Sequence, residues 1–160
     1  MKSFADLLIT WHAKSGRHHL PWQQSKDPYS VWVSEIMLQQ TQVATVINYY
    51  HRFMKKFPTI KALADADEEE VMQLWSGLGY YRRARFLHEG AQMIMEEMEG
   101  ILPSDFDMMM KIPGIGRSTA GAISAFSFNQ KKAILDGNVK RVLSRYFLVA
   151  QWTGLPKTEK

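Results

Sequence analysis

The residues of this chain best suited to chemistry are two carboxylates in separate segments, Glu35 and Asp136. On a helix, Glu35 shares a face with Val31 and Leu38, which precede and follow it by about one turn. Partial desolvation on such a face raises the pKa of a carboxyl group, which can then donate a proton near neutral pH. The alternative is a surface glutamate on an amphipathic helix, and periodicity alone favours that alternative.

Asp136 stands directly before Gly137 and Asn138, at the predicted start of a helix. Asp and Asn are preferred N-cap residues, so we expect one of the two to cap this helix. A carboxylate at the same place could also stabilise a cationic sugar. The two roles are compatible.

A Pro/Gly turn at residues 113–116 opens another predicted helix, whose first residue is Arg117. Gly114 and Gly116 allow a phosphate to approach the backbone closely, and a helix N-terminus directs N–H groups toward an anion. Such a clamp fixes position on a nucleic-acid duplex without reading its sequence. The alternative is an ordinary turn between two helices.

Charge is concentrated in the last third of the chain. Residues 111–148 hold seven Lys and Arg and one Asp, a net charge of +6, whereas the whole chain carries +4. This distribution indicates that a polyanion contacts the C-terminal third. A solvated basic helix face is the alternative.

Two further segments combine polar and aromatic groups. Residues 39–42 read Gln-Gln-Thr-Gln, and long amides can fill the gap left when a base leaves its stack. Residues 79–85 place Tyr80 and Tyr81 beside Arg82, Arg83 and Arg85, a combination suited to wedging a base step and holding phosphates. The alternatives are a hydrophilic helix junction and a helix start with core tyrosines.

Composition restricts the class of protein. The chain has 160 residues, 46% of them hydrophobic, which suits one domain or one domain and part of another. It has no cysteine, which excludes disulfides, thiolate metal sites and iron–sulfur ligation by its own residues. The five histidines show no metal-binding spacing, so we predict no metal site. No apolar run has the length of a membrane span, and the cytoplasm is the expected location.

Every periodic stretch predicts a helix, so the expected fold class is all-α. Helices are expected at the N-terminus, after Pro28, over 43–57, from an Asp67 cap, over 82–98, from Ser104 with Asp107 in a capping box, after the 113–116 turn, and over 139–147. The N-terminal helix and the last helix are expected to expose apolar faces.

These motifs together closely resemble the MutY-type adenine DNA glycosylases of the helix-hairpin-helix glycosylase superfamily. The matching segments are residues 20–23, 28–43, 74–81, 112–121 and 134–141, in order along nearly the whole chain. The resemblance implies a six-helix barrel at 20–130 with a helix-hairpin-helix at about 106–126. It assigns residues 1–19 and 131–160 to parts of a second helical domain that holds a cluster.

The resemblance implies excision of adenine mispaired with 8-oxoguanine or guanine in base excision repair. Glu35 corresponds to the glutamate that protonates adenine at N7, and Asp136 to the aspartate that stabilises the sugar oxocarbenium ion. The other implied positions are Asn138 and Ser118 for transition-state support; Trp22, Leu38 and Val43 for the base pocket; Gln40 and Tyr80 for entry into the duplex; and Gly114, Gly116, Arg117, Lys140 and Arg141 for phosphate contacts.

Two positions depart from relatives that cleave strands. Ser118 stands where such relatives carry a nucleophilic lysine, so we expect a monofunctional glycosylase with little lyase activity. His18 stands where some relatives carry a lysine that can trap the sugar. The four-cysteine motif for the 4Fe–4S cluster of the full-length family is also absent. The chain is therefore expected to be the N-terminal catalytic portion of such a protein and to bind no cofactor itself.

Double-stranded DNA with an A·8-oxoguanine or A·G mispair is the expected partner, with nucleoid association in a bacterium; neither a membrane nor a protein partner is indicated. Two alternatives stay open. One is a truncated helix-hairpin-helix fragment that binds DNA without catalysis. The other is an endonuclease III-like glycosylase, against which Ser118 and the polar run at 39–42 both argue.

Overall fold

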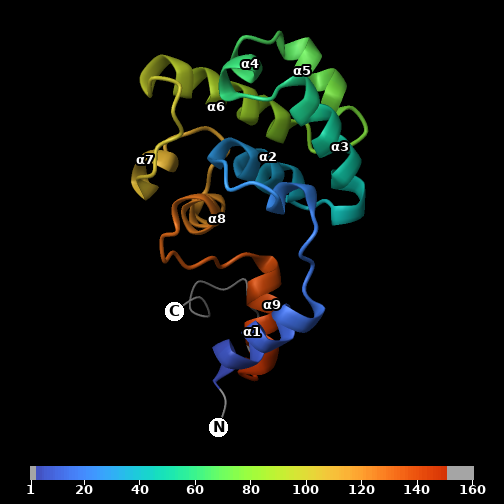
Figure 1. Cartoon of the computed structure of the whole chain (residues 1–160), viewed down its shortest axis with the longest axis vertical. Helices are drawn as coiled ribbons and strands as arrows, with labels where there is room; N and C mark the ends of the chain where they lie inside the picture. Colours follow the sequence, from blue (N-terminus) through green and yellow to red (C-terminus); the bar gives the residue numbers. More distant parts are fainter. Residues whose placement is uncertain (1–2, 151–160) are drawn as a thin grey trace.

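A computed structural model describes residues 3–150, and all regular structure in this range is helical (Figure 1). The all-α prediction is therefore confirmed for the described residues. The elements are α1 Phe4–Ser15, the short 3₁₀ helix η1 Pro21–Gln23, α2 Pro28–Leu38, α3 Val43–Lys56, α4 Ile60–Ala64, α5 Glu68–Trp75, α6 Arg82–Glu97, α7 Phe106–Met109, α8 Arg117–Phe128 and α9 Gly137–Tyr146.

Side-chain caps fix several helix starts. The Asp27 carboxylate accepts a hydrogen bond from the Ser30 N–H at 2.8 Å and begins α2, and Thr59 caps α4 in the same way. Helix α4 was not predicted, because its five residues are too few to show helical periodicity. The predicted start of α7 at Ser104 is wrong. Asp105 is the N-cap, and its carboxylate accepts from the Met108 N–H at 2.8 Å.

Helix α2 lies at the centre of the fold. It packs against α8 on one side and against α3, α6 and η1 on others (Figure 1). Eight of its eleven residues are buried, among them Trp32 and Val33, which have no exposed surface. A helix that is apolar nearly all round can exist only inside a protein, so its position follows from its sequence.

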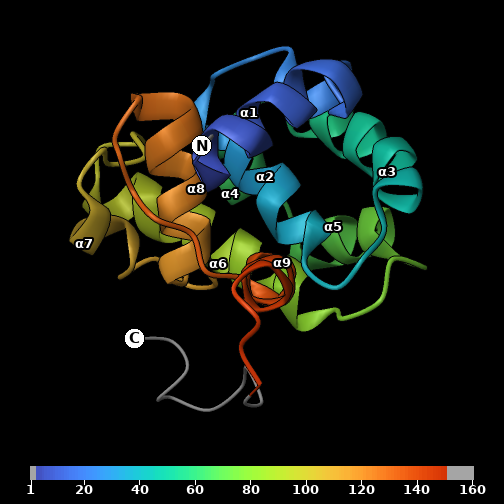
Figure 2. The ribbon, with the colours of Figure 1, turned by 90° about the horizontal axis from the view of Figure 1, so that it is seen from below.

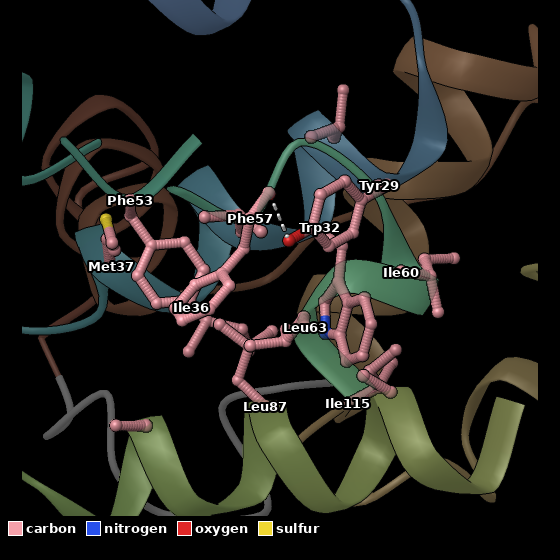
Figure 3. Packing of buried hydrophobic residues seen from close by; sticks show 14 of the residues in the cluster. Tyr29, Trp32, Ile36, Met37, Phe53, Phe57, Ile60, Leu63, Leu87 and Ile115 are labelled. Carbon is pink, nitrogen blue, oxygen red and sulfur yellow. Dashed lines mark hydrogen bonds between the residues drawn. The ribbon is translucent and has the colours of Figure 1, made fainter. Parts of the chain in front are cut away.

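Aromatic side chains fill the space around α2. The Tyr29 hydroxyl donates a hydrogen bond to the Phe57 carbonyl at 2.8 Å, and Trp32 lies beside it (Figure 3). The Phe53 ring meets the Phe57 ring edge-on at 5.1 Å and the Trp75 ring at 5.9 Å. Complete burial of a side chain such as Phe53 contributes about 1.5–3 kcal/mol to stability. These contacts hold α2, α3 and α5 together.

Helices α1 and α9 lie at one end of the molecule, apart from the other helices (Figure 1); Figure 2 views this end, with α9 seen along its axis. Neither helix has a buried residue. They meet where the Phe4 ring lies 4.6 Å from the Tyr146 ring and 6.1 Å from the Phe147 ring. Their predicted exposure of apolar side chains is confirmed, for example at Ile9 and Trp11.

Among residues 3–150, none of the helices combines the length and the apolar character needed to cross a membrane.

Helix α6 approaches α2 closely at Gly90. A Cβ atom at Gly90 would lie 2.9 Å from both a Trp32 ring atom and the Ile112 Cγ2 atom. Both neighbours are buried side chains that cannot move aside. We expect Gly90→Val to lower the free energy of unfolding by about 2–3 kcal/mol, measured by urea denaturation. The control is Gly137→Val, since a Cβ atom at Gly137 meets nothing within 4 Å. Equal stability of the two variants would contradict the tight packing.

Candidate active site

A cleft with a volume of about 1160 Å³ lies between the barrel-like body of helices and the start of α9. Its walls come from the last turn of α2, the segment 39–44, the first turn of α8 and residues 134–141. Predicted site residues that line it are Glu35, Leu38, Gln40, Val43, Ser118, Asp136, Asn138 and Arg141. Segments about 100 residues apart in the chain therefore meet at one place.

Glu35 lies in the last turns of α2, with most of its surroundings apolar or uncharged. Burial raises the pKa of its carboxyl group to about 7, and the negative charge of Asp136 adds to this increase. Desolvation favours the neutral form because a carboxylate loses its hydration shell in such a place. The glutamate is therefore not a solvated surface residue, and it can hold a proton at neutral pH.

Asp136 has two functions in this geometry. Its Oδ1 atom accepts a hydrogen bond from the Val139 N–H at 2.8 Å, which makes Asp136 the N-cap of α9. The sequence predicts that either Asp136 or Asn138 caps this helix. The same carboxylate faces the cleft and is close enough to raise the pKa of Glu35. The site thus holds one carboxyl group in a desolvated place and one held by the N-terminus of a helix.

The segment that brings Asp136 to the cleft has no regular structure and crosses α8 at Gly121. A Cβ atom at Gly121 would lie 3.2 Å from the Ala133 carbonyl oxygen and from a side-chain atom of Ile134. Absence of a side chain therefore lets the segment pass close to the helix. On the facing side, the Gln39 amide donates to the Thr119 hydroxyl at 3.4 Å and joins the end of α2 to α8.

The helix-hairpin-helix segment is formed by α7, a turn and α8. Gly114 has a left-handed backbone with φ of 79°, and Gly116 is the N-cap of α8 without a side-chain hydrogen bond. First-turn N–H groups of α8 thus have no side-chain cap and suit an anion. The Arg117 guanidinium lies 5.7 Å from the centre of the Phe106 ring. Gly114, Gly116, Arg117 and Lys140 do not line the cleft, so these predicted phosphate contacts lie outside it.

A smaller recess of about 260 Å³ lies beside the cleft, between residues 39–40 and 80–83. Gln40 has a φ of 56° and Tyr80 a φ of 49°, which are left-handed values that side chains seldom adopt. Tyr80 is 59% exposed, so the alternative of a core tyrosine is wrong. Both predicted duplex-entering residues therefore border one recess on the surface.

The proposed group of three phosphate-binding arginines needs correction. Arg83 is buried and donates hydrogen bonds to backbone carbonyls at the end of α2. Arg85 pairs with Glu68 at 2.8 Å, and the Arg82 guanidinium lies over the Phe86 ring. Arg83 is unsuitable for phosphate because a buried guanidinium with backbone partners cannot reach DNA. Arg83 precedes the buried Leu87 by four residues and therefore lies on the same face of α6. This helical spacing could have predicted that Arg83 is buried.

Trp22, which the sequence predicts for the base pocket, lies away from the cleft. Trp22 packs edge-on against Tyr50 at 5.4 Å and contacts the hydrophobic core, and the structure does not bring it into the cleft. Arg17 and Thr119 line the cleft, although sequence reasoning missed them. Arg17 follows the α1 helix without a pattern of its own, and Thr119 continues the predicted first turn of α8.

The residues present do not fit an iron–sulfur cluster. Such a cluster needs thiolate ligands, and the chain has no cysteine. Within residues 3–150, no group of three or more His, Asp or Glu is placed to hold a metal ion.

The coupling between the two carboxyl groups can be tested by titration. In carboxyl-carbon NMR, Glu35 is expected to titrate near pH 7. Asp136→Asn should lower this pKa but leave it above 4.5, because desolvation is the larger cause and Asn preserves the cap. The control is Asp105→Asn, which makes the same change at the N-cap of α7. A Glu35 midpoint near 4.5 in the unaltered protein would contradict the desolvated site.

Stability should also depend on pH through Glu35. The pKa of this group is higher in the folded state than in the unfolded chain, so its carboxylate opposes folding. The stability of the folded state with neutral Glu35 is fully present below pH 4.5. This stability is lost as the pH rises through 7 and the buried carboxyl group ionises. We therefore expect Glu35→Gln to be more stable than the unaltered protein above pH 7, by on the order of 2–3 kcal/mol. Denaturation at pH 4 and pH 8 checks this, and equal differences at both would refute it.

Comparison with known proteins identifies the family of the chain. Residues 33–160 match the family model of the HhH-GPD superfamily base excision DNA repair protein. The chain is 51% identical over 146 residues to the adenine DNA glycosylase of Buchnera aphidicola subsp. Baizongia pistaciae (strain Bp), covering 91% of this chain and 42% of that protein. It is 49% identical over 152 residues to the human adenine DNA glycosylase, covering 89% of this chain and 28% of that protein. The chain thus spans less than half the length of these curated relatives.

Solved structures share the arrangement of helices. A thermostable thymine-DNA glycosylase superimposes with a TM-score of 0.84 at 28% identity, over 90% of this chain and 66% of that chain. A trapped endonuclease III–DNA covalent intermediate superimposes with a TM-score of 0.80 at 22% identity, over 96% of this chain and 76% of that chain. This likeness confirms the predicted helix-hairpin-helix glycosylase fold. Together with the match over residues 33–160, it shows that the chain belongs to the HhH-GPD superfamily of base excision DNA repair proteins.

Proposed function

We propose that this protein is an adenine DNA glycosylase that hydrolyses the N-glycosidic bond of adenine mispaired with 8-oxoguanine or guanine. The observation that carries the proposal is Glu35, a carboxyl group with a pKa of about 7 that shares a cleft with Asp136. General acid catalysis needs a group that is protonated near the working pH. The curated relatives named above support adenine as the base.

The proposed reaction separates the roles of the two carboxyl groups. Neutral Glu35 gives its proton to adenine N7, and the C1′–N9 bond breaks with its electron pair moving onto the base. The sugar becomes an oxocarbenium ion, which the Asp136 carboxylate stabilises. Water then adds to C1′ and loses a proton, which leaves an abasic sugar and free adenine. Two carboxyl groups in different environments serve glycoside hydrolysis in the same way.

Binding is proposed to use three parts of the surface. The N-terminus of α8 with Gly114, Gly116 and Arg117 contacts phosphates, as do Lys140 and Arg141 near the start of α9. Gln40 and Tyr80 enter the duplex beside the extruded base, since both border one surface recess. The cleft volume of about 1160 Å³ is sufficient for an extruded nucleotide. Such a protein acts in the compartment that holds the chromosome.

Hydrolysis without strand cleavage is the proposed outcome. A lyase needs an amine that attacks C1′. Ser118 lines the cleft at the position where strand-cleaving relatives are expected to carry a nucleophilic lysine. No lysine is among the described residues that line the cleft. Arg17 and Arg141 also line the cleft, but a guanidinium group is a poor nucleophile.

The proposal is tested by single-turnover release of adenine from an 8-oxoguanine·adenine duplex. We expect abasic sites that break only after alkali is added. Glu35→Gln should reduce the rate at least about 100-fold, because general acid catalysis contributes about 10²–10⁴-fold, while duplex binding is retained. The control is Glu89→Gln at an exposed position of α6. Duplex binding without adenine release by the unaltered protein would instead favour a DNA-binding module without catalysis.

A further inference from the structure

Arg83 is the most heavily hydrogen-bonded side chain near the site, although it contacts neither cleft carboxylate. It is 9% exposed. Its Nη1 group donates to the Ile36 carbonyl at 2.9 Å and to the Met37 carbonyl at 2.8 Å, and also to the Gln39 carbonyl. The Ile36 and Met37 carbonyls belong to the last turn of α2, where the helix itself supplies few donors. The Ile36 carbonyl also accepts from the Gln39 N–H at 3.3 Å. Arg83, on α6, therefore supplies hydrogen bonds to the C-terminal end of α2.

The same guanidinium also binds the loop that follows α5. Its Nη2 group donates to the Gly79 carbonyl at 3.1 Å, and its Nε donates to the Tyr80 carbonyl at 3.4 Å. The Trp75 indole N–H also donates to the Gly79 carbonyl, at 3.2 Å. The Arg83 guanidinium lies 5.4 Å from the centre of the Tyr80 ring. One side chain thus joins residues 36–41 to residues 79–80.

Each loop that Arg83 binds contains one residue other than glycine in the left-handed region. Gln40 follows the bonded Gln39 carbonyl, and Tyr80 follows the bonded Gly79 carbonyl. A left-handed backbone costs about 1–2 kcal/mol at a residue that is not glycine. Such conformations persist only where surrounding contacts fix them, and the recess lined by Gln40 and Tyr80 lies over Arg83.

An arginine is suited to this place because its planar fork offers five donors in fixed directions. No carboxylate of the described residues forms an ion pair with Arg83. Backbone carbonyls at the negative end of the α2 dipole instead balance the charge. A lysine retains the charge but has no fork that reaches both loops.

We propose that Arg83 is a positioning residue that holds Gln40 and Tyr80 in the backbone conformations with which they meet the duplex. This inference rests on the proposed function for the roles of Gln40 and Tyr80 in DNA. Arg83 acts through these two residues and not through the chemistry at Glu35.

The first test needs no DNA. In Arg83→Lys, the backbone {¹H}–¹⁵N NOE values of Gln40 and Tyr80 should fall, while those of α8 and the NMR titration of Glu35 stay unchanged. The control is Arg85→Lys, the same change on the same helix at an exposed ion pair. Unchanged NOE values at both residues would overturn the proposal. If Arg83→Lys does not fold, Thr41→Val removes one acceptor of the Nη2 group, at 3.1 Å, and should cause a smaller decrease in the same direction.

The second test measures the affinity for an 8-oxoguanine·adenine duplex relative to a matched duplex by fluorescence anisotropy. Arg83→Lys should reduce this ratio about tenfold, an effect the size of one strong hydrogen bond. In a Gln40→Ala/Tyr80→Ala background it should have no further effect, because the residues through which Arg83 acts are gone. If Arg83→Lys reduces the ratio by the same factor in the Gln40→Ala/Tyr80→Ala background, it acts by a general loss of structure, and the proposal is overturned. All variants are measured in a Glu35→Gln background, which is expected to bind the duplex without releasing adenine. The ratio is then independent of adenine release, so failure of the proposed chemistry gives a different result.

Discussion

The C-terminal end of α2 lies inside the protein, and the rest of the site depends on this constraint. Buried carbonyls that lack partners cost free energy comparable to a lost hydrogen bond. Arg83 of α6, more than forty residues later in the chain, donates hydrogen bonds to carbonyls at this end of α2. The Met37 carbonyl accepts from Arg83, and the Ile36 carbonyl accepts from both Arg83 and the Gln39 N–H. Burial of this last turn of α2 also desolvates Glu35, one residue before Ile36. The structural support and the unusual carboxyl group therefore have the same origin.

The two carboxyl groups illustrate how environment separates chemically similar side chains. Burial of Glu35 raises the pKa of its carboxyl group and shifts it toward the neutral form. Asp136 accepts a hydrogen bond from the Val139 N–H and caps the N-terminus of α9. The fold itself sets this difference.

The sequence was sufficient for the long helices and for several of the residues that line the cleft, and the reasons differ from one element to another. Helices α3 and α6 are periodic over three or more turns, whereas α4 has five residues and no detectable period. The face of Glu35 was predictable, but its desolvation was not, because Ser118 and Asp136 come from distant parts of the chain. Arg83 was misassigned because three neighbouring arginines look alike until the face of α6 is considered. Thr119 and Arg17 became visible only when tertiary contacts formed the cleft.

The cleft joins two bodies, since Glu35 belongs to the central helix and Asp136 to α9 at the end of the molecule (Figure 1). The connections between them are the irregular segments at 16–20, before η1, and at 129–136. Contacts between the bodies thus set the separation of the carboxyl groups. A ligand that contacts both walls of the cleft therefore stabilises the packing of the two bodies against each other, in proportion to its affinity. In the proposed reaction, substrate binding and the separation of the two carboxyl groups are thus thermodynamically linked.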